Sequence, residues 1–355
     1  MRVDVLTPDR EEEYFSLANS LSGSMLYGSR KFRDFLVRTL PDAYPMYFMA
    51  LDPQIVGCLP TFVLNTSRYG KVMNALPFYG SHGAPVVDGR DGRAREIKTC
   101  LINRMLEVAD DLDVTSTTLV TSPLDADHEF YKSLDSVTHQ DERIGQVSFL
   151  PCAEVGGYGE AIMAGCHQKT RNAVRKGLKS GFSFHECNDI SGLQKLHRLH
   201  KEGMEAISAN PKPFRVFEAI RETMNYGGDY RVSLAEREGA TAAALLLLYF
   251  RDQVEYFTPA IDPNFRTDQP LAALIFKAME QAARDGYKTW NWGGTWHSQS
   301  SVYFFKSRWG AEDIPYHYYT WLRDRQILHL DPSEILDRYP NFYVVPFDAL
   351  DKPDA

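Results

Sequence analysis

A run of basic side chains without acids is the first feature of this sequence that suits ligand binding. Residues 161–185 carry five positive side chains and no acid, although the net charge of the chain is −8. Lys169 and Lys176 are seven residues apart and share one face of a helix, while Arg171 and Arg175 form an i,i+4 pair on a neighbouring face. Such donors suit a diphosphate, as in a nucleotide sugar, a lipid-diphosphate carrier or coenzyme A. A solvated helix face is the alternative interpretation.

Lys306 is a second candidate, because its sequence neighbours are aromatic. The four aromatic residues that flank it are Tyr303, Phe304, Phe305 and Trp309. An ammonium group in a water-poor site exerts a strong electrostatic pull on a developing negative charge. The alternative is that the lysine packs its stem on the aromatic patch and extends its charge into solvent. Trp296 and His297 precede this segment in a polar loop and are further candidates.

Metal, disulfide and nucleophile patterns are weak in this chain. His197 and His200 are three residues apart, but no third ligand follows at a recognisable spacing, so a surface helix explains them better. No GxSxG, HExxH or Walker pattern occurs. The five cysteines form no CxxC pair, which argues against a disulfide framework and a thiolate zinc site. The sequence therefore predicts no metal site, no tightly bound cofactor and a reducing, cytoplasmic location.

The two halves of the chain repeat one order of predicted elements. In the first half we expect strands at 2–6, 45–51, 55–64, 117–120 and 144–150, helices at 9–19, 28–40, 97–106 and 129–134, and a glycine-rich loop over 65–93. In the second half we expect helices at 159–180, 193–207, 214–224, 270–284 and 298–308, and strands at 230–237, 241–250, 253–258, 288–292 and 315–322. Both halves follow the order helices, strand hairpin, long helix, strand, short helix, strand. We therefore predict two α/β domains, 1–150 and 151–330, with a tail at 331–355; one large α/β domain is the alternative.

This element order resembles that of the GNAT acyltransferase fold. Three segments, CHQKTRNAVRKGLKSGF, DGYKTWNWGG and SSVYFFKSRWGAE, are similar to the FemAB-like branch of that superfamily, which includes peptidoglycan bridge aminoacyltransferases and N-acyltransferases of polysaccharide clusters. The loop ALPFYGSHGAP, which contains Tyr79 and His82, is similar to the Pro-x-x-x-Gly-Gly-Pro-type loop of the branch. The resemblance spans residues 26–321. It implies tandem GNAT-like domains, each a mixed central sheet flanked by helices, with the acceptor held mainly on the first domain.

The resemblance also implies roles for individual residues. The phosphates of the acyl donor would bind at the helix preceded by Arg266 and Gln269, although the glycine-rich loop expected there is degenerate and an ordinary capped helix is the alternative. Lys306 would stabilise the charge that develops on the acyl carbonyl. Glu255 and Tyr256, on the strand before, are candidates for neutralising the amine, and strand alternation lets only one of them face the cleft. Trp296 and His297 would lie on the donor side, and Tyr79 and His82 on the acceptor side with the basic segment.

These features predict a cytoplasmic N-acyltransferase that moves an acyl or aminoacyl group to an amine of a cell-envelope precursor or amino sugar. Acyl-CoA is the favoured cosubstrate, because no heptad-patterned insertion resembles the helical arm of tRNA-dependent bridge enzymes. Aminoacyl-tRNA is the other donor considered, and the acceptor is a small or lipid-linked molecule. The acidic balance argues against DNA binding, and the longest apolar run, Ala242–Phe250, is too short for an integral membrane segment. The alternative function is a non-catalytic ligand-binding module with the GNAT fold, and the sequence does not specify an oligomeric state.

Overall fold

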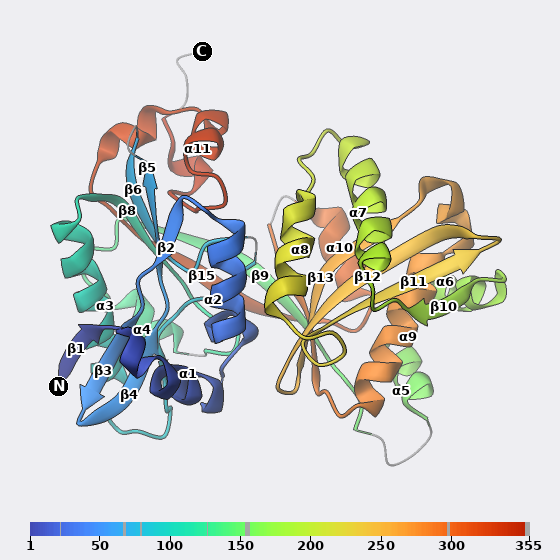
Figure 1. The fold of residues 1–355 in the computed structure, drawn as a ribbon, viewed down its shortest axis with the longest axis horizontal. Helices are drawn as coiled ribbons and strands as arrows, with labels where there is room; N and C mark the ends of the chain where they lie inside the picture. The colour runs from blue at the N-terminus through green and yellow to red at the C-terminus, as the bar shows by residue number, and fades with distance from the viewer. Residues whose placement is uncertain are drawn as a thin grey trace. The chain divides into compact units, whose positions relative to one another are not determined.

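The computed structural model describes residues 1–21, 23–66, 69–78, 80–125, 127–152, 157–296 and 299–351. The predicted site residues Tyr79 and His297 lie outside the described residues. The chain divides into two compact units (Figure 1). Unit 1 comprises Met1–Arg143 and Pro315–Ala355, and unit 2 comprises Ile144–Ile314. Residues 315–330, which the sequence analysis assigned to the second domain, group with unit 1.

Unit 1 is built on two sheets. Its elements are β1 (Arg2–Val5), α1 (Glu11–Ser20), α2 (Arg30–Thr39), β2 (Ala43–Pro45), β3 (Phe48–Asp52), β4 (Gln54–Leu59), β5 (Phe62–Thr66), β6 (Gly70–Ala75), β7 (Val86–Val87), α3 (Ala94–Asp111), β8 (Val114–Val120), α4 (His128–Lys132), α11 (Pro332–Arg338) and parts of β9 (His139–Phe149) and β15 (Glu312–Leu322). The strand orders are β1-β3-β4-β7 and β15-β8-β6-β5-β2. Helix α3 buries Ile97, Leu101 and Met105 in the unit's core.

Two expectations for unit 1 are wrong. The single strand expected over 55–64 is two strands, β4 and β5, which belong to different sheets. Pro60 lies between them and cannot donate to a strand ladder, which accounts for the break. The loop expected over 65–93 contains β6 and β7. The last four residues of β6 are all buried, so its sequence shows no alternation of apolar and polar side chains.

Unit 2 has one sheet, with helices on both faces. Its elements are α5 (Tyr158–Gly165), α6 (Gln168–Lys179), β10 (Ser183–Glu186), α7 (Ile190–Glu205), α8 (Phe214–Thr223), β11 (Tyr230–Arg237), β12 (Ala240–Phe250), β13 (Gln253–Ile261), α9 (Pro270–Arg284), β14 (Thr289–Thr295) and α10 (Ser300–Ser307). The strand order is β10-β11-β12-β13-β14-β9. Helix α9 packs its apolar face on β12 and on Trp290 and Trp292 of β14. It begins where expected, with Gln269 in the left-handed region and Pro270 in the first turn.

The single helix expected over 159–180 is the pair α5 and α6. The chain breaks at Cys166 and His167, both of which have extended backbone. The His167 side chain accepts a hydrogen bond of 3.2 Å from the Lys169 amide and so caps α6. The sequence analysis also missed β10, a short strand that pairs with β11.

The two units share one internal plan, which confirms the predicted mixed α/β fold. In unit 1, β5 and β6 are antiparallel, and β6 then pairs in parallel with β8 through the crossover helix α3. In unit 2, β12 and β13 are antiparallel, and β13 pairs in parallel with β14 through α9. A helix between two parallel neighbours is the βαβ unit that the element order predicts.

A difference between the two parallel pairs distinguishes the units. The β6–β8 ladder in unit 1 continues to Ala75↔Leu119, at the ends of both strands. The loop after β6 then folds back over these ends, where the Gly83 amide donates a hydrogen bond of 3.0 Å to the Val120 carbonyl. A Cβ atom on Gly83 would collide with the carbonyl of Ala75, so the approach requires glycine. The ends of β6 and β8 are therefore paired and covered.

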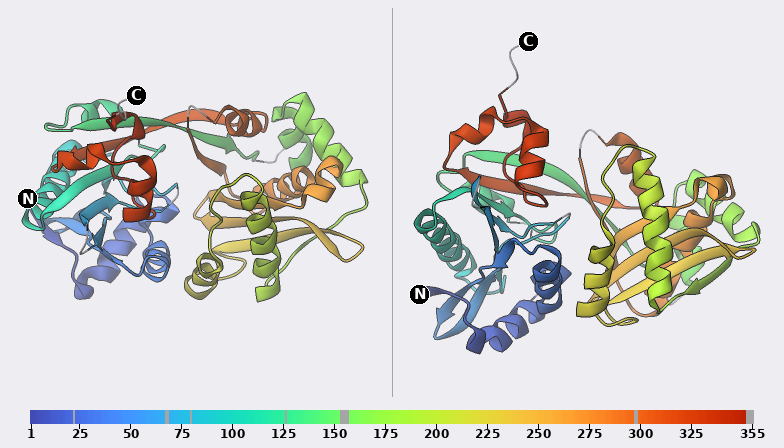
Figure 2. Two further views of the ribbon diagram at one scale, coloured as in Figure 1. Left: turned by 90° about the horizontal axis from the view of Figure 1, so that it is seen from above. Right: turned by 45° about the horizontal axis from the view of Figure 1, so that its top comes forward.

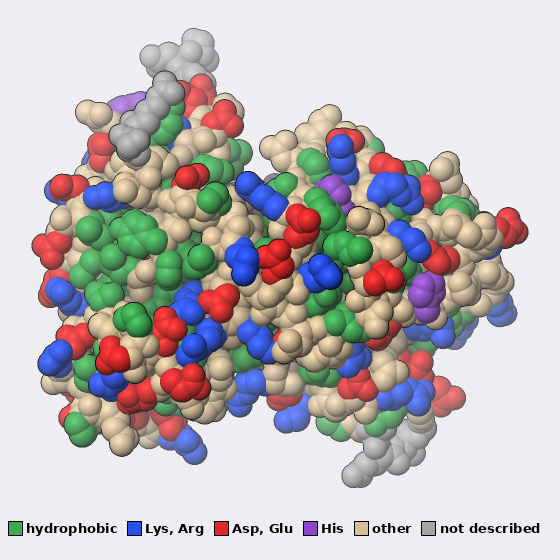
Figure 3. Space-filling view, viewed as in Figure 1, with side chains coloured by type: hydrophobic (Ala, Val, Ile, Leu, Met, Phe, Trp, Pro, Cys, Tyr) green, Lys and Arg blue, Asp and Glu red, His purple; other side chains and the backbone are tan. Residues whose placement is uncertain are grey.

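Surface charge and hydropathy add two observations. On the face drawn in Figure 3, acidic and basic side chains are interspersed, so the net charge of −8 is not gathered there into one acidic patch. Over the part of the chain that the structure describes, no helix combines the length and the apolar character that crossing a membrane requires.

Candidate active site

Strands β13 and β14 of unit 2 separate before they end. Their last parallel pair is Glu255↔Asn291, although β13 continues to Ile261 and β14 to Thr295. Beyond that pair, each strand stays hydrogen-bonded only to its outer neighbour, β12 or β9. The register on β12 shifts at this point and leaves Phe257 as an extra residue, which is a β-bulge. The result is an opening between two strands, where unit 1 has a closed ladder.

Glu255 lies at the start of this opening. Its side chain is buried, and the Asn291 amide donates a hydrogen bond of 2.8 Å to Glu255 Oε2. Asn291 Oδ1 in turn accepts a hydrogen bond of 2.9 Å from the Gly293 amide. Gly293 has a φ of +73°, in the left-handed region that glycine enters without strain. The carboxylate is thus held by a side chain that the turn at Gly293 fixes.

Lys306 binds the other side of the same turn. Its ammonium donates hydrogen bonds to the carbonyls of Gly293 (3.1 Å) and Gly294 (3.0 Å) and to Thr295 Oγ1 (2.8 Å). Burial lowers the pKa of Lys306 to about 8, so the group is charged at neutral pH. An ammonium group has three donors, and all three are engaged. The lysine is therefore not a surface residue with a solvated head, which was the alternative interpretation of the sequence.

A chain of polar side chains extends from Lys306 to β9. Thr295 Oγ1 donates to Gln146 Oε1 at 3.3 Å, and Gln146 Nε2 donates to Asp313 Oδ1 at 3.3 Å. The Tyr303 hydroxyl donates to the other oxygen of Asp313 at 2.7 Å. Sequence reasoning missed Asn291, Thr295 and Gln146, because their roles depend on contacts between strands far apart in the chain.

Tyr256 lies on the opposite face of β13 from Glu255. Its ring packs against Trp290 and Trp292, with centroids 6.1 and 4.8 Å away. Burial raises the pKa of its hydroxyl far above the usual value. Of the two predicted alternatives, Glu255 joins the polar network and Tyr256 joins the apolar core.

Lys212 is a residue that sequence reasoning missed. It lies between α7 and α8, and its ammonium sits 5.4 Å from the ring centroid of Phe257, the bulge residue of β13. Burial lowers the pKa of Lys212 to about 8, and among the described residues its ammonium forms no ion pair. The signal in the sequence is a lysine held between Pro211 and Pro213, where the chain is stiff.

The predicted donor-side residues lie at or near the ends of the two separating strands. Arg266 is exposed just before α9, and its carbonyl accepts from Gln269 Nε2 at 2.9 Å. Gln269 is the residue that precedes α9, with a φ of +61°. Gly177 of α6 packs so closely on the carbonyl of Gln269 that a side chain there would collide with it. Trp296 follows β14 and is exposed.

The basic helix α6 presents four cations to solvent, namely Lys169, Arg175, Lys176 and Lys179. No ion pair is formed by these four with any residue that the structure describes. Arg171 differs, because its guanidinium donates to the Cys166 carbonyl and to Gln168 Oε1. The predicted Arg171–Arg175 fork is therefore reduced to Arg175, since Arg171 is engaged within its own helix turn.

In unit 1, His82 is buried rather than open to solvent. Its Nδ1 lies 2.8 Å from the Thr121 carbonyl, and its ring packs edge-on against Tyr27 and Tyr316. Burial lowers the pKa of His82 to about 4. One cavity beside it holds about 30 Å³, which is room for a water molecule or two.

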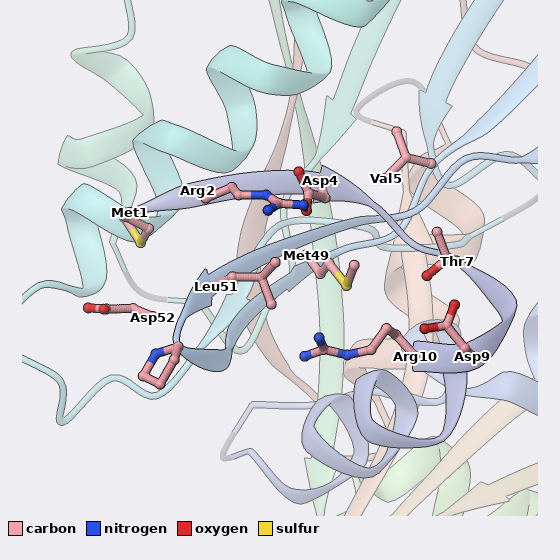
Figure 4. Close-up of a pocket in the computed structure, with 11 residues that line it drawn as sticks. Met1, Arg2, Asp4, Val5, Thr7, Asp9, Arg10, Met49, Leu51 and Asp52 are labelled. Atoms are coloured by element: carbon pink, nitrogen blue, oxygen red, sulfur yellow. The ribbon is translucent and has the colours of Figure 1, made fainter.

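A larger hollow of unit 1 lies at strands β1 and β3 (Figure 4). It holds about 870 Å³ and is lined by residues that include Arg2, Asp4 and Arg10. Arg2 pairs with Asp4, and Arg10 pairs with Glu13 at 2.8 Å. It contains none of the candidate residues. Within the described part of the chain, no three His, Cys, Asp or Glu side chains are grouped so as to hold a metal ion.

The fold is similar to that of GNAT proteins. Residues 164–307 match the family described as acetyltransferase (GNAT) domain. No curated protein sequence matches this chain. Among solved structures, the fold is similar to that of FemX, with a TM-score of 0.72 and 14% identity over 92% of this chain and 98% of that chain.

Two further structures share the fold. One is L-PGS from Bacillus licheniformis, with a TM-score of 0.54 and 14% identity over 95% of this chain and 98% of that chain. The other is a tandem GNAT protein from the clavulanic acid biosynthesis pathway, with a TM-score of 0.53 and 12% identity over 90% and 97% of the two chains. The predicted resemblance to tandem GNAT proteins of the FemAB-like branch is confirmed at the level of fold. The family match over residues 164–307 supports an acyltransferase.

Proposed function

We propose that the protein is an N-acyltransferase whose reaction takes place in unit 2, between β13 and β14. The observation that carries this proposal is the separation of these strands after Glu255↔Asn291, compared with the closed β6–β8 ladder of unit 1. An extended donor arm entering this opening would meet backbone groups of both strands. It would also meet Glu255 at the inner end. Unit 1, whose equivalent position is filled by its own loop, is then the acceptor side.

In the proposed reaction, Glu255 takes a proton from the attacking ammonium so that a neutral amine reaches the acyl carbonyl. The amine nitrogen forms a bond to the carbonyl carbon, and the carbonyl oxygen becomes an oxyanion. The bond between carbon and the donor's leaving group then breaks, the electron pair leaves with that group, and the nitrogen releases its second proton to the leaving group or to solvent, which yields a neutral amide. With acyl-CoA, the favoured donor, the leaving group is the thiolate of coenzyme A; with aminoacyl-tRNA it would be a ribose hydroxyl.

Lys306 contributes in two ways in this scheme. Its three hydrogen bonds hold the turn at Gly293–Thr295 and, through Asn291, the carboxylate of Glu255. Its positive charge, in a site with little water, also favours the oxyanion. Tyr256 packs with the tryptophans and supports the strand; it takes no part in proton transfer.

The donor's phosphates are assigned to Arg266 and to the chain before α9, which includes Gln269, with Trp296 nearby. The cations of α6 are assigned to phosphate groups on the acceptor side, and Lys212 to an anionic group that approaches the β13 bulge. The acceptor is an amine of a cell-envelope precursor or amino sugar, small or lipid-linked. We propose a cytoplasmic location for this reaction.

A thermal-shift panel of acetyl-CoA, longer acyl-CoAs and amino-sugar nucleotides tests the proposal. A ligand at 100 times its Kd should add about 2.7 kcal/mol to the free energy of unfolding. We expect stabilisation by an acyl-CoA in the wild type, less in Arg266→Ala, and no loss in the control Arg215→Ala on α8. Thiol release in the presence of an amino sugar then separates an enzyme from a ligand-binding module, which would bind without turnover. Stabilisation by no acyl-CoA would remove the favoured donor.

A further inference from the structure

Helix α10 has an inverted distribution of side chains. Its buried residue is Lys306, whereas Phe304 and Phe305 are 54% and 38% exposed. Val302 and Trp296 beside them are also exposed. A surface helix of a globular protein normally turns its apolar stripe inward and its charges outward. An exposed cluster of large apolar side chains on one short helix indicates an interaction surface.

A cation shares the outer face of this helix. Positions 304, 305 and 308 lie on one side at helical spacing, so Arg308 projects beside the two phenylalanines. The guanidinium of Arg308 makes no ion pair with any described residue. The outer face of α10 is therefore aromatic and positive together.

The basic helix α6 adjoins α10. The His167 amide, which immediately precedes α6, donates a hydrogen bond of 2.9 Å to the Arg308 carbonyl. Gly310 also packs tightly on the carbonyl of Gly165. In the left view of Figure 2, the red-orange α10 lies beside the light-green helices α5 and α6, along one side of unit 2. The exposed cations Arg175, Lys176 and Lys179 lie on the later turns of α6, the helix that begins immediately after this contact.

We propose that α10 and α6 form a docking surface for an anionic lipid bilayer. Phe304 and Phe305 would enter the boundary between headgroups and acyl chains, with Val302 at its edge. Arg308 and the α6 cations would lie at the level of the lipid phosphates. This division of aromatic and cationic side chains is typical of proteins that lie on a membrane surface.

Charge complementarity selects this occupant. The chain carries a net charge of −8, so an unpaired basic cluster on it is directed at an anionic partner. A small anion would account for the cations but not for the exposed phenylalanines. A neutral protein surface would account for the phenylalanines but not for four cations that form no ion pair with a described residue. An anionic membrane accounts for both, and it would bring a lipid-linked acceptor to unit 2.

Co-sedimentation of the full chain with vesicles tests the proposal without any turnover. We expect binding to phosphatidylcholine vesicles that contain one third phosphatidylglycerol, much weaker binding to pure phosphatidylcholine, and loss of binding at high salt. Each basic residue near such a surface contributes about 1 kcal/mol, or about fivefold. Reversing two charges, Lys176→Glu with Lys179→Glu, should therefore weaken binding by at least about twentyfold. Phe304→Ser with Phe305→Ser should weaken it by about tenfold or more.

Matched controls use the other helices of unit 2. Ile207→Ser removes a side chain that is 70% exposed outside the surface, and Lys201→Glu with Arg215→Glu makes the same charge change on α7 and α8; both should bind as the wild type does. Phe305 also contacts the buried Trp292, so its replacement removes core packing. If the double variant unfolds for this reason, Phe304→Ser alone tests the apolar part of the surface. Absent binding, equal binding to both vesicles, or an equal loss in the controls would overturn the proposal. So would a dimer that dissociates in Phe304→Ser, which would make the patch a contact between copies of the chain. Because no outcome here measures turnover, each of them tests the docking surface and leaves the proposed acyl transfer between β13 and β14 to its own experiments.

Discussion

Glu255 and Asn291 form the last residue pair of the β13–β14 ladder, and the same two side chains are joined by a hydrogen bond of 2.8 Å. The point at which the sheet opens is thus also the point at which a buried carboxylate is held. Parallel strands in an α/β sheet bind ligands beyond their paired region, where backbone groups become available. The carboxylate lies at the inner end of that region, where a reacting amine would need it.

The pair Glu255 and Tyr256 can be separated by mutation. Glu255→Gln keeps an acceptor for the Asn291 amide but removes the base, so we expect kcat to fall by about 10²–10⁴ with little change in KM. Tyr256→Phe should change kcat less than about threefold, since the ring packing is retained. Steady-state kinetics of the two purified variants measures the difference. The opposite order of effects would assign the proton transfer to Tyr256.

Lys306→Ala should lower kcat by about 10²-fold, because the turn at Gly293–Thr295 loses the ammonium that holds it and Glu255 is displaced with that turn. It should also lower the free energy of unfolding, because Thr295 and two backbone carbonyls lose their hydrogen-bond donor. Each acceptor that no water molecule reaches should cost about 1–3 kcal/mol. Lys306→Arg should recover part of the rate, since its planar group places the donors elsewhere. Arg215→Ala on α8 is the control. Wild-type turnover in Lys306→Ala would exclude the proposed role.

The low pKa of Lys306 predicts a pH effect on stability. Its folded-state pKa of about 8 lies below the unfolded value of about 10.4. Between these values the unfolded chain binds more protons, so the free energy of unfolding rises with pH. The free energy of unfolding of Lys306→Met should therefore rise less than that of the wild type between about pH 8 and 9.5. Urea unfolding of both proteins across this pH range measures the difference between their free energies of unfolding. Other titrating groups contribute equally to the two proteins and cancel in that difference. If the free energies of unfolding of the two proteins changed with pH in the same way, burial would not lower the pKa of Lys306.

The closed end of unit 1 predicts a strict need for glycine at position 83. A methyl group there would meet the Ala75 carbonyl, and Gly83→Ala should lower the free energy of unfolding by about 2 kcal/mol or more. Gly89 lies in the turn after β7, and a Cβ atom there would stand in open space, so Gly89→Ala is the control and should change stability by less than about 0.5 kcal/mol. Thermal unfolding compares the two. Equal stabilities would mean that the loop does not lie on β6 and β8 as described.

The fold could be predicted because the periodicity of the helices and strands is strong. The helix after Gln269 is one example, since Pro270 and Gly286 mark its two ends. Breaks inside a continuous pattern were missed: α5 and α6 were joined because the apolar spacing runs through Cys166 and His167. Pro60 is the residue in the sequence that indicates the break between β4 and β5, because a proline cannot donate to a strand ladder.

The candidate site was only partly predictable. Lys306 and Glu255 stand out by their neighbours and their strand position. Their partners Asn291, Thr295 and Gln146 do not, because no local pattern records which strands become adjacent. The opening depends on the residue at which the pairing of β13 and β14 ends. No short segment of the sequence shows that position, because the two strands are far apart in the chain. Arg171 shows the converse, a residue with a suitable type and spacing whose donors are taken by its own helix turn.

Hydrogen exchange of the full chain with and without acetyl-CoA tests the central claim most directly. The account predicts that acetyl-CoA slows exchange at residues 256–258 and 292–295 and at the first turn of α9, and that this protection is lost in Arg266→Ala. The ends of β6 and β8 in unit 1 should exchange at the same rate in both conditions, because their ladder is already closed. Protection at Ala75 and Leu119 instead, with β13 and β14 unchanged, would contradict the assignment of the donor site to unit 2.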